Sequence, residues 1–165
     1  MLAIQSTDAL IFFVLSLPIC IWVAWNDMKF MKIPNKSVVA LAGLFLVMGL
    51  FLLPLPEYGW RLVQLLIILA IGFVLNMLRL VGAGDAKFAA AAAPFIPGGD
   101  ATVVVYLFAG VLLVAFAVHR MAKNISIIRN LVPEWKSWEI REFPMGLALG
   151  STLSFYLLLG AAFGS

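Results

Sequence analysis

Residues 79–94 read RLVGAGDAKFAAAAAP, and they interrupt a sequence that is otherwise strongly apolar. Of the 165 residues in the chain, 64% are hydrophobic and only 12% are charged. A water-soluble domain of this size keeps roughly a third of its surface in contact with water, and this chain has too few polar side chains to cover it. We therefore predict an all-α integral membrane protein whose solvent is lipid.

Six apolar segments separated by short polar stretches predict six transmembrane helices within one domain, 1–165. Their approximate limits are 8–25, 37–53, 61–80, 86–101, 102–118 and 144–163. A helix needs about 20 apolar residues to cross the hydrocarbon core, so the short fourth segment is also compatible with a re-entrant half-helix. No Lys or Arg precedes the first segment, and we expect it to stay in the mature protein.

Basic residues outnumber acidic ones in the connections 26–36, 79–87 and 119–143. These connections lie on one side of the membrane only if the fourth segment crosses it, and the positive-inside rule makes that side cytoplasmic. We therefore expect both termini outside (periplasmic) and an amphipathic cytoplasmic loop at 119–143, with tryptophans at headgroup depth. The net charge of +3 is scattered and indicates no nucleic-acid partner.

Two aspartates fall at the same predicted depth, because Asp27 follows the first segment and Asp85 precedes the fourth. Ionisable groups at membrane depth are costly and usually functional. Taken singly, Asp27 also fits a solvated loop acid and Asp85 a helix N-cap. Gly82 and Gly84 favour a functional site, since glycine allows close backbone approach and a positive φ, which would fix the depth of Asp85.

Two close carboxylates have a known use in hydrolysis. Like charges roughly 3 Å apart cannot both ionise, so such a pair holds one proton near neutral pH. The ionised member takes a proton from water, which attacks a peptide carbonyl, while the protonated member hydrogen-bonds the carbonyl oxygen. This chemistry needs no metal and no cofactor, and we expect none in a chain with one His and one Cys.

These residues resemble the type IV prepilin peptidase family, intramembrane aspartyl proteases with a Gly-x-Gly-Asp signature. The signature is GAGD at 82–85, followed by Ala86 and Lys87. The stretch DMKFMKIPNK at 27–36 is similar to the family's other catalytic aspartate with its Ile-Pro-Asn, and FPMG at 143–146 resembles the Pro-x-Gly that opens the last helix. The similarity extends from residue 20 to residue 150.

The resemblance implies an aspartic endopeptidase of the bacterial inner membrane that cleaves prepilin-like precursors at the cytoplasmic face. Its partners would be the lipid bilayer and a precursor made of a leader peptide and a hydrophobic helix. Asp27 and Asp85 would be the catalytic pair, with Gly82, Gly84 and Lys87 in the active-site loop. The short 26–36 connection lacks the cysteine pair of longer relatives. The chain therefore resembles the short branch of the family that serves Flp-type tight-adherence pili. This resemblance argues against methyltransferase activity. The chain is also similar to archaeal preflagellin peptidases.

Other polar residues near the aspartates have two interpretations each. Lys87 either lowers the pKa of Asp85 or anchors the topology. Asn35 either caps the second helix or orients Asp27, and Asn76 either joins two helices or belongs to the site. The acidic residues of the long loop, Glu134, Glu139 and Glu142, are candidates for pairing with lysines of a leader peptide.

A small proton- or cation-coupled transporter is the main alternative to a peptidase. In that protein the two carboxylates would carry ions, and they would lie nearer the bilayer centre. The sequence leaves the oligomeric state open.

Overall fold

The computed structural model describes residues 1–165 as an all-helical protein, which confirms the all-α part of the prediction. Its α-helices are α1 (Ser6–Phe30), α2 (Asn35–Leu52), α3 (Leu55–Met77), α4 (Ala83–Ala92), α5 (Ala101–Asn124), α6 (Ser126–Leu131) and α7 (Met145–Phe163). Its short 3-10 turns are η1 (Ala93–Phe95), η2 (Gly98–Asp100) and η3 (Lys136–Trp138). Five helices, all except α4 and α6, are long and apolar enough to cross a membrane, which is the pattern of a multi-pass membrane protein.

The predicted fourth span, 86–101, differs most from the structure. Helix α4 has ten residues, which corresponds to about 15 Å at 1.5 Å per residue, or half of the hydrocarbon core. Pro94 and Pro97 explain the short helix, because proline lacks the N–H that a continuing helix requires. The chain instead passes through η1 and η2 before α5 begins. Six full-length spans are therefore not what the structure shows.

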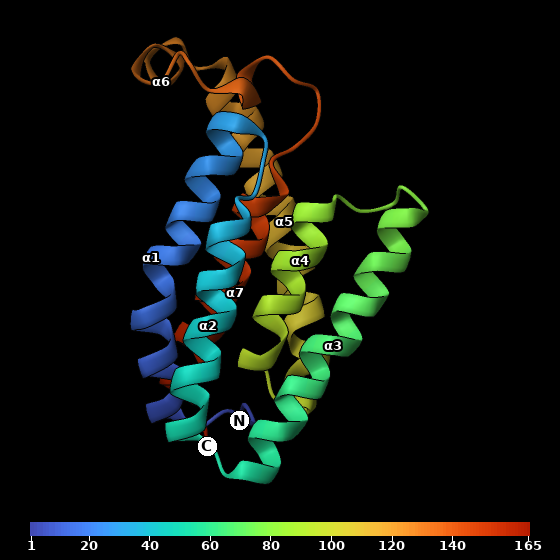
Figure 1. The fold of residues 1–165 in the computed structure, drawn as a ribbon. Coiled ribbons are helices and arrows are strands. Elements are labelled where there is room, and N and C mark those ends of the chain that lie inside the picture. The colour runs from blue at the N-terminus through green and yellow to red at the C-terminus, as the bar shows by residue number, and fades with distance from the viewer.

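The connections that carry the candidate residues lie at one end of the bundle. Figure 1 shows the α1–α2 link, the α3–α4 link and the segment around α6 at the end opposite to both termini. At the other end, Leu2 pairs with Gly164 in an isolated β-bridge, and the Ala3 N–H donates to the Asp100 carboxylate at 2.9 Å. Successive connections thus alternate between the two ends of the bundle. Which end faces the cytoplasm stays a prediction.

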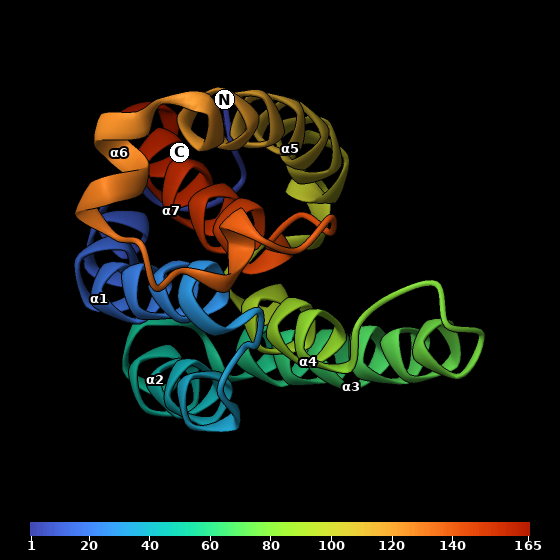
Figure 2. The same cartoon turned by 90° about the horizontal axis from the view of Figure 1, so that it is seen from above.

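Glycines on α7 allow close packing against α1. A Cβ on Gly150 would lie 3.0 Å from the Cys20 carbonyl oxygen, and a Cβ on Gly160 would lie 2.9 Å from that of Ala9. Viewed along the bundle, α7 lies between α1 and α5 (Figure 2). Gly146 and Gly150 have the Gly-x-x-x-Gly spacing that is typical of close helix contacts, and both face α1.

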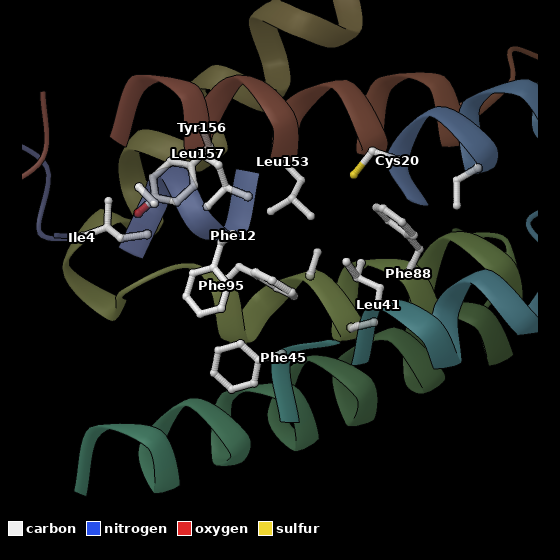
Figure 3. Packing of buried hydrophobic residues seen from close by; sticks show 14 residues of the cluster. Ile4, Phe12, Cys20, Leu41, Phe45, Phe88, Phe95, Leu153, Tyr156 and Leu157 are labelled. Carbon is white, nitrogen blue, oxygen red and sulfur yellow. The ribbon is translucent and has the colours of Figure 1, made fainter. Parts of the chain in front are cut away.

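Aromatic rings fill the centre of the bundle and fix the position of α4. Phe12 of α1, Phe45 of α2 and Phe95 of η1 are buried, with ring centroids 5.0 to 5.8 Å apart. Phe88 of α4 is fully buried in the same cluster, beside Leu41 (Figure 3). The core therefore holds α4, and with it the aspartate in its first turn, in a defined place.

The segment predicted as the loop 119–143 is partly helical and packs on itself. Helix α5 continues to residue 124, and α6 and η3 follow it. The buried His119 stacks on Trp138 with ring centroids 5.2 Å apart, and Trp135 stacks on Trp138 at 5.5 Å. Trp25 meets Trp135 edge to face at 5.1 Å. These rings attach the segment to α1 and α5.

Candidate active site

Asp27 lies in the last turn of α1, because that helix continues past the predicted end at residue 25. Met31 ends the helix in the left-handed conformation, with φ of 53°, and its N–H donates to the Asp27 carbonyl at 2.9 Å. The Asp27 side chain is only 6% exposed. It is therefore a buried carboxylate and not the solvated loop acid that the sequence also allowed.

The first turn of α7 meets this carboxylate. The Gly146 N–H donates to Asp27 Oδ2 at 2.6 Å. A Cβ on Gly146 would lie 2.9 Å from Asp27 Cβ and 3.0 Å from Oδ2, so any larger residue would displace the acid. In the sequence, Gly146 stood out only as the end of the FPMG stretch, and that stretch gave no sign of a contact with Asp27.

Asp85 occupies the third position of α4, with Gly82 as the N-cap residue. Its carboxylate turns back to the Gly82 backbone N–H, the direction taken by an acidic side chain in a capping box. A Cβ on Gly82 would lie 2.5 Å from Asp85 Oδ2, and one on Gly84 would lie 3.2 Å from Ile33 Cβ. The expectation of a positive φ is wrong, because no glycine has one. Close approach, of Asp85 to Gly82 and of Ile33 to Gly84, is what favours glycine at both positions.

The two aspartates line the same cavity, which has a volume of about 460 Å³. Its walls also include the α1–α2 link, the glycine signature and the end of the long loop. Burial, and then the negative charge of Asp27, raise the pKa of Asp85 to about 6. The pair is therefore suited to holding one proton near neutral pH, which provides one base and one acid in a single cavity.

The other polar candidates near the signature make hydrogen bonds to neighbouring segments and none to the two aspartates. Lys87 Nζ donates to Asn35 Oδ1 at 3.2 Å, which links α4 to the first residue of α2. Asn35 does not cap α2, because Pro34 occupies the N-cap position. Asn76 Nδ2 donates to the Val81 carbonyl at 2.9 Å, a bond from the last turn of α3 to the α3–α4 link and not between two helices.

The structure separates the three glutamates of the long loop. Glu134 pairs with Lys29 at 3.3 Å, and Glu139 is exposed away from the cavity. Only Glu142 lines the cavity, together with Ile140 and Phe143. The sequence indicated these apolar residues as part of an amphipathic segment, but it could not show that they form a wall of the site.

A second cavity, of about 410 Å³, lies between α3, α4, α5 and α7. Its lining is almost entirely apolar, with Gln64 and Thr152 as its polar side chains and no titratable group. No cluster of three or more His, Cys, Asp or Glu side chains is arranged to hold a metal ion. Of these two cavities, the one that contains the two aspartates is therefore the one with titratable side chains.

The fold and the site together define a helical membrane protein with two acidic side chains in one cavity. The family model of the type IV leader peptidases matches residues 12–118, which include both aspartates and the glycine signature. The chain belongs to the type IV leader peptidase family. Neither a curated protein nor a solved structure matches it significantly. The family supports a leader peptidase that processes prepilin-type precursors, and it does not favour the transporter alternative.

Proposed function

We propose that this protein is an aspartic endopeptidase that removes the leader peptide of Flp-type prepilin-like precursors, with Asp27 and Asp85 as its catalytic pair. The observation that carries the proposal is the shared cavity, which receives one acid from α1 and one from α4 beside the glycine signature. Both acids fall within the residues that the family model matches.

Hydrolysis by this pair uses one water molecule and returns both acids to their starting forms. The ionised carboxylate takes a proton from water, whose oxygen attacks the scissile carbonyl carbon, while the protonated carboxyl gives its proton to the carbonyl oxygen. In the second step the C–N bond breaks. The proton taken from water passes to the departing nitrogen, and the other proton returns from the diol to its carboxyl.

The short connections support the Flp-type assignment. Only residues 31–34 join α1 to α2, so no insert of the kind found in longer relatives separates these helices, and N-methylation is not part of the proposal. Five membrane-length helices and the basic connections beside the site support an inner-membrane protein whose site faces the cytoplasm.

Substitution of each acid by its amide tests the proposal, using co-expression with a candidate precursor and mass spectrometry of the mature N-terminus. Asp27→Asn and Asp85→Asn each remove an ionisable group with little change in shape, and we expect cleavage to fall by at least about 1,000-fold. The matched control is Asp8→Asn, because Asp8 is a buried acid on α1 at the opposite end of the bundle. Cleavage retained by either active-site variant would exclude that residue from the pair.

Glu142 is proposed to bind a basic residue of the leader, because its side chain is the only one of the three loop glutamates that lines the cavity. Glu142→Gln should raise the KM for a precursor with a basic leader about tenfold and leave kcat within twofold. Glu139→Gln is the matched control, since Glu139 is exposed on the same loop. Equal KM values for the two variants would remove Glu142 from substrate recognition.

A further inference from the structure

The two carboxylates of the cavity are held by different surroundings. Asp27 is 6% exposed and accepts the Gly146 N–H at 2.6 Å. Asp85 is half-buried and lies in the first turn of its own helix, against Gly82. The first acid is therefore fixed by a distant element, whereas the second is fixed by a neighbouring residue in its own turn.

The Gly146 N–H is free to bind a carboxylate, because Gly146 is the second residue of α7 and first-turn N–H groups have no acceptor within their helix. A hydrogen bond between an N–H and a carboxylate is charge-assisted and favours the ionised form. The partial positive charge at a helix N-terminus acts in the same direction. The other charged groups at the cavity are Asp85, Glu142 and Lys32, from α4, the long loop and the α1–α2 link. None of them makes a hydrogen bond to Asp27.

We propose that Gly146 is a positioning residue that holds Asp27 as the ionised, water-activating member of the pair and leaves Asp85 as the proton donor. The inference rests on the proposed function and extends it, because it assigns the two roles and requires α7, which lies beyond the residues matched by the family model. Glycine is required at this position, since a Cβ would lie 2.9 Å from Asp27 Cβ.

The sharpest test removes the N–H and adds no atoms. Glycolic acid incorporated at position 146 by nonsense suppression replaces the 145–146 amide by an ester, and the steady-state cleavage of a precursor is then measured. Loss of a hydrogen bond to a charged group corresponds to about a tenfold to hundredfold loss. We expect this loss in kcat, with KM unchanged within twofold, because the donor binds a catalytic acid and not the substrate.

The same ester at position 150 is the matched control. Gly150 lies one turn further along α7 on the same face, against Cys20 of α1, so this change disturbs the same helix pair without touching Asp27. Its kcat should stay within twofold of that of the unmodified protein. A second variant, Gly146→Ala, displaces the Asp27 side chain and should lower kcat about a hundredfold. Gly150→Ala should mainly lower the melting temperature.

Three results would overturn the inference. These are an unchanged kcat for the 146 ester, an equal loss for the 150 ester, or a rise in KM without a fall in kcat. Failure of the proposed function gives a different result, since Asp27→Asn would then leave cleavage intact. If the 146 ester is poorly folded, Gly146→Ala compared with Gly150→Ala at equal amounts of folded protein decides the same question.

Discussion

Asp85 shows how a single residue of the site affects stability. Its pKa is raised from 3.8 to about 6, first by burial and then by the charge of Asp27. Well below pH 3.8 the carboxyl is protonated in the folded and unfolded states alike, so it does not change the free energy of unfolding. As the pH rises from 3.8 through about 6, the unfolded chain ionises while the folded carboxyl still holds its proton. The free energy of unfolding therefore falls over this range and does not fall further above it.

The amide variant should reverse this loss. We expect Asp85→Asn to melt at the same temperature as the unmodified protein near pH 4 and at a higher temperature near pH 8. The gain should be on the order of 1 kcal/mol, since a half-exposed side chain is partly screened by solvent. Melting curves in detergent across this pH range measure the difference. A gain of the same size at both pH values would contradict the assigned pKa.

At the scale of elements, the position of α4 depends on small residues in its neighbours. A Cβ on Gly72 of α3 would lie 2.9 Å from Ala86 Cβ, and Ala86 directly follows Asp85. The ten residues of α4 make too short a helix to be stable alone. Its contacts with α3 and with the aromatic core therefore determine the depth of the acid.

Alanine at two positions of α3 separates this packing effect from helix propensity. Gly72→Ala should destabilise the protein by about 1–3 kcal/mol, since two packed backbones must move apart, and it should also lower cleavage. Gly59→Ala has nothing within 4 Å of the new Cβ and should be neutral or stabilising by up to about 1 kcal/mol. Thermal melting and a cleavage assay of both variants provide the comparison. Equal melting temperatures would contradict close packing of α3 against α4.

At the scale of the whole molecule, the bundle has one end with the aspartates and another with the termini (Figure 1). The latter is closed by buried polar contacts, since Asp100 accepts hydrogen bonds from the Ala3 N–H and the Tyr156 hydroxyl, at 2.9 and 2.7 Å. In this arrangement the chain enters α4 at the end of the bundle with the aspartates and leaves η2 at the end with the termini, although α4 itself is short.

Cysteine labelling tests this topology in a Cys20→Ala background. Single cysteines at the exposed positions Lys32, Leu80 and Asn130 should react with an impermeant maleimide in inverted membrane vesicles. Cysteines at the exposed positions Glu57 and Gly99 should react only in right-side-out vesicles or intact cells. Labelling of positions 32 and 80 from opposite faces would place Asp27 and Asp85 on different sides and would exclude the shared site.

The sequence by itself determined the helical membrane class, the family and the two acids as candidates. These follow from local information, because a run of apolar residues predicts a helix in lipid and a short motif keeps its spacing wherever it lies. The prolines after the alanine run were also visible in the sequence, but their effect on the length of α4 was not anticipated.

Only the tertiary structure decided which groups meet. The bond from Gly146 to Asp27 joins residues 119 positions apart, and the cavity receives Glu142 but neither Glu134 nor Glu139. Such contacts depend on how α1, α4 and α7 pack, and packing is a property of all their side chains together. The glycines illustrate the same limit. Their sequence suggested a positive φ, whereas in the structure Asp85 and Ile33 approach Gly82 and Gly84 closely and would have to move to make room for a Cβ.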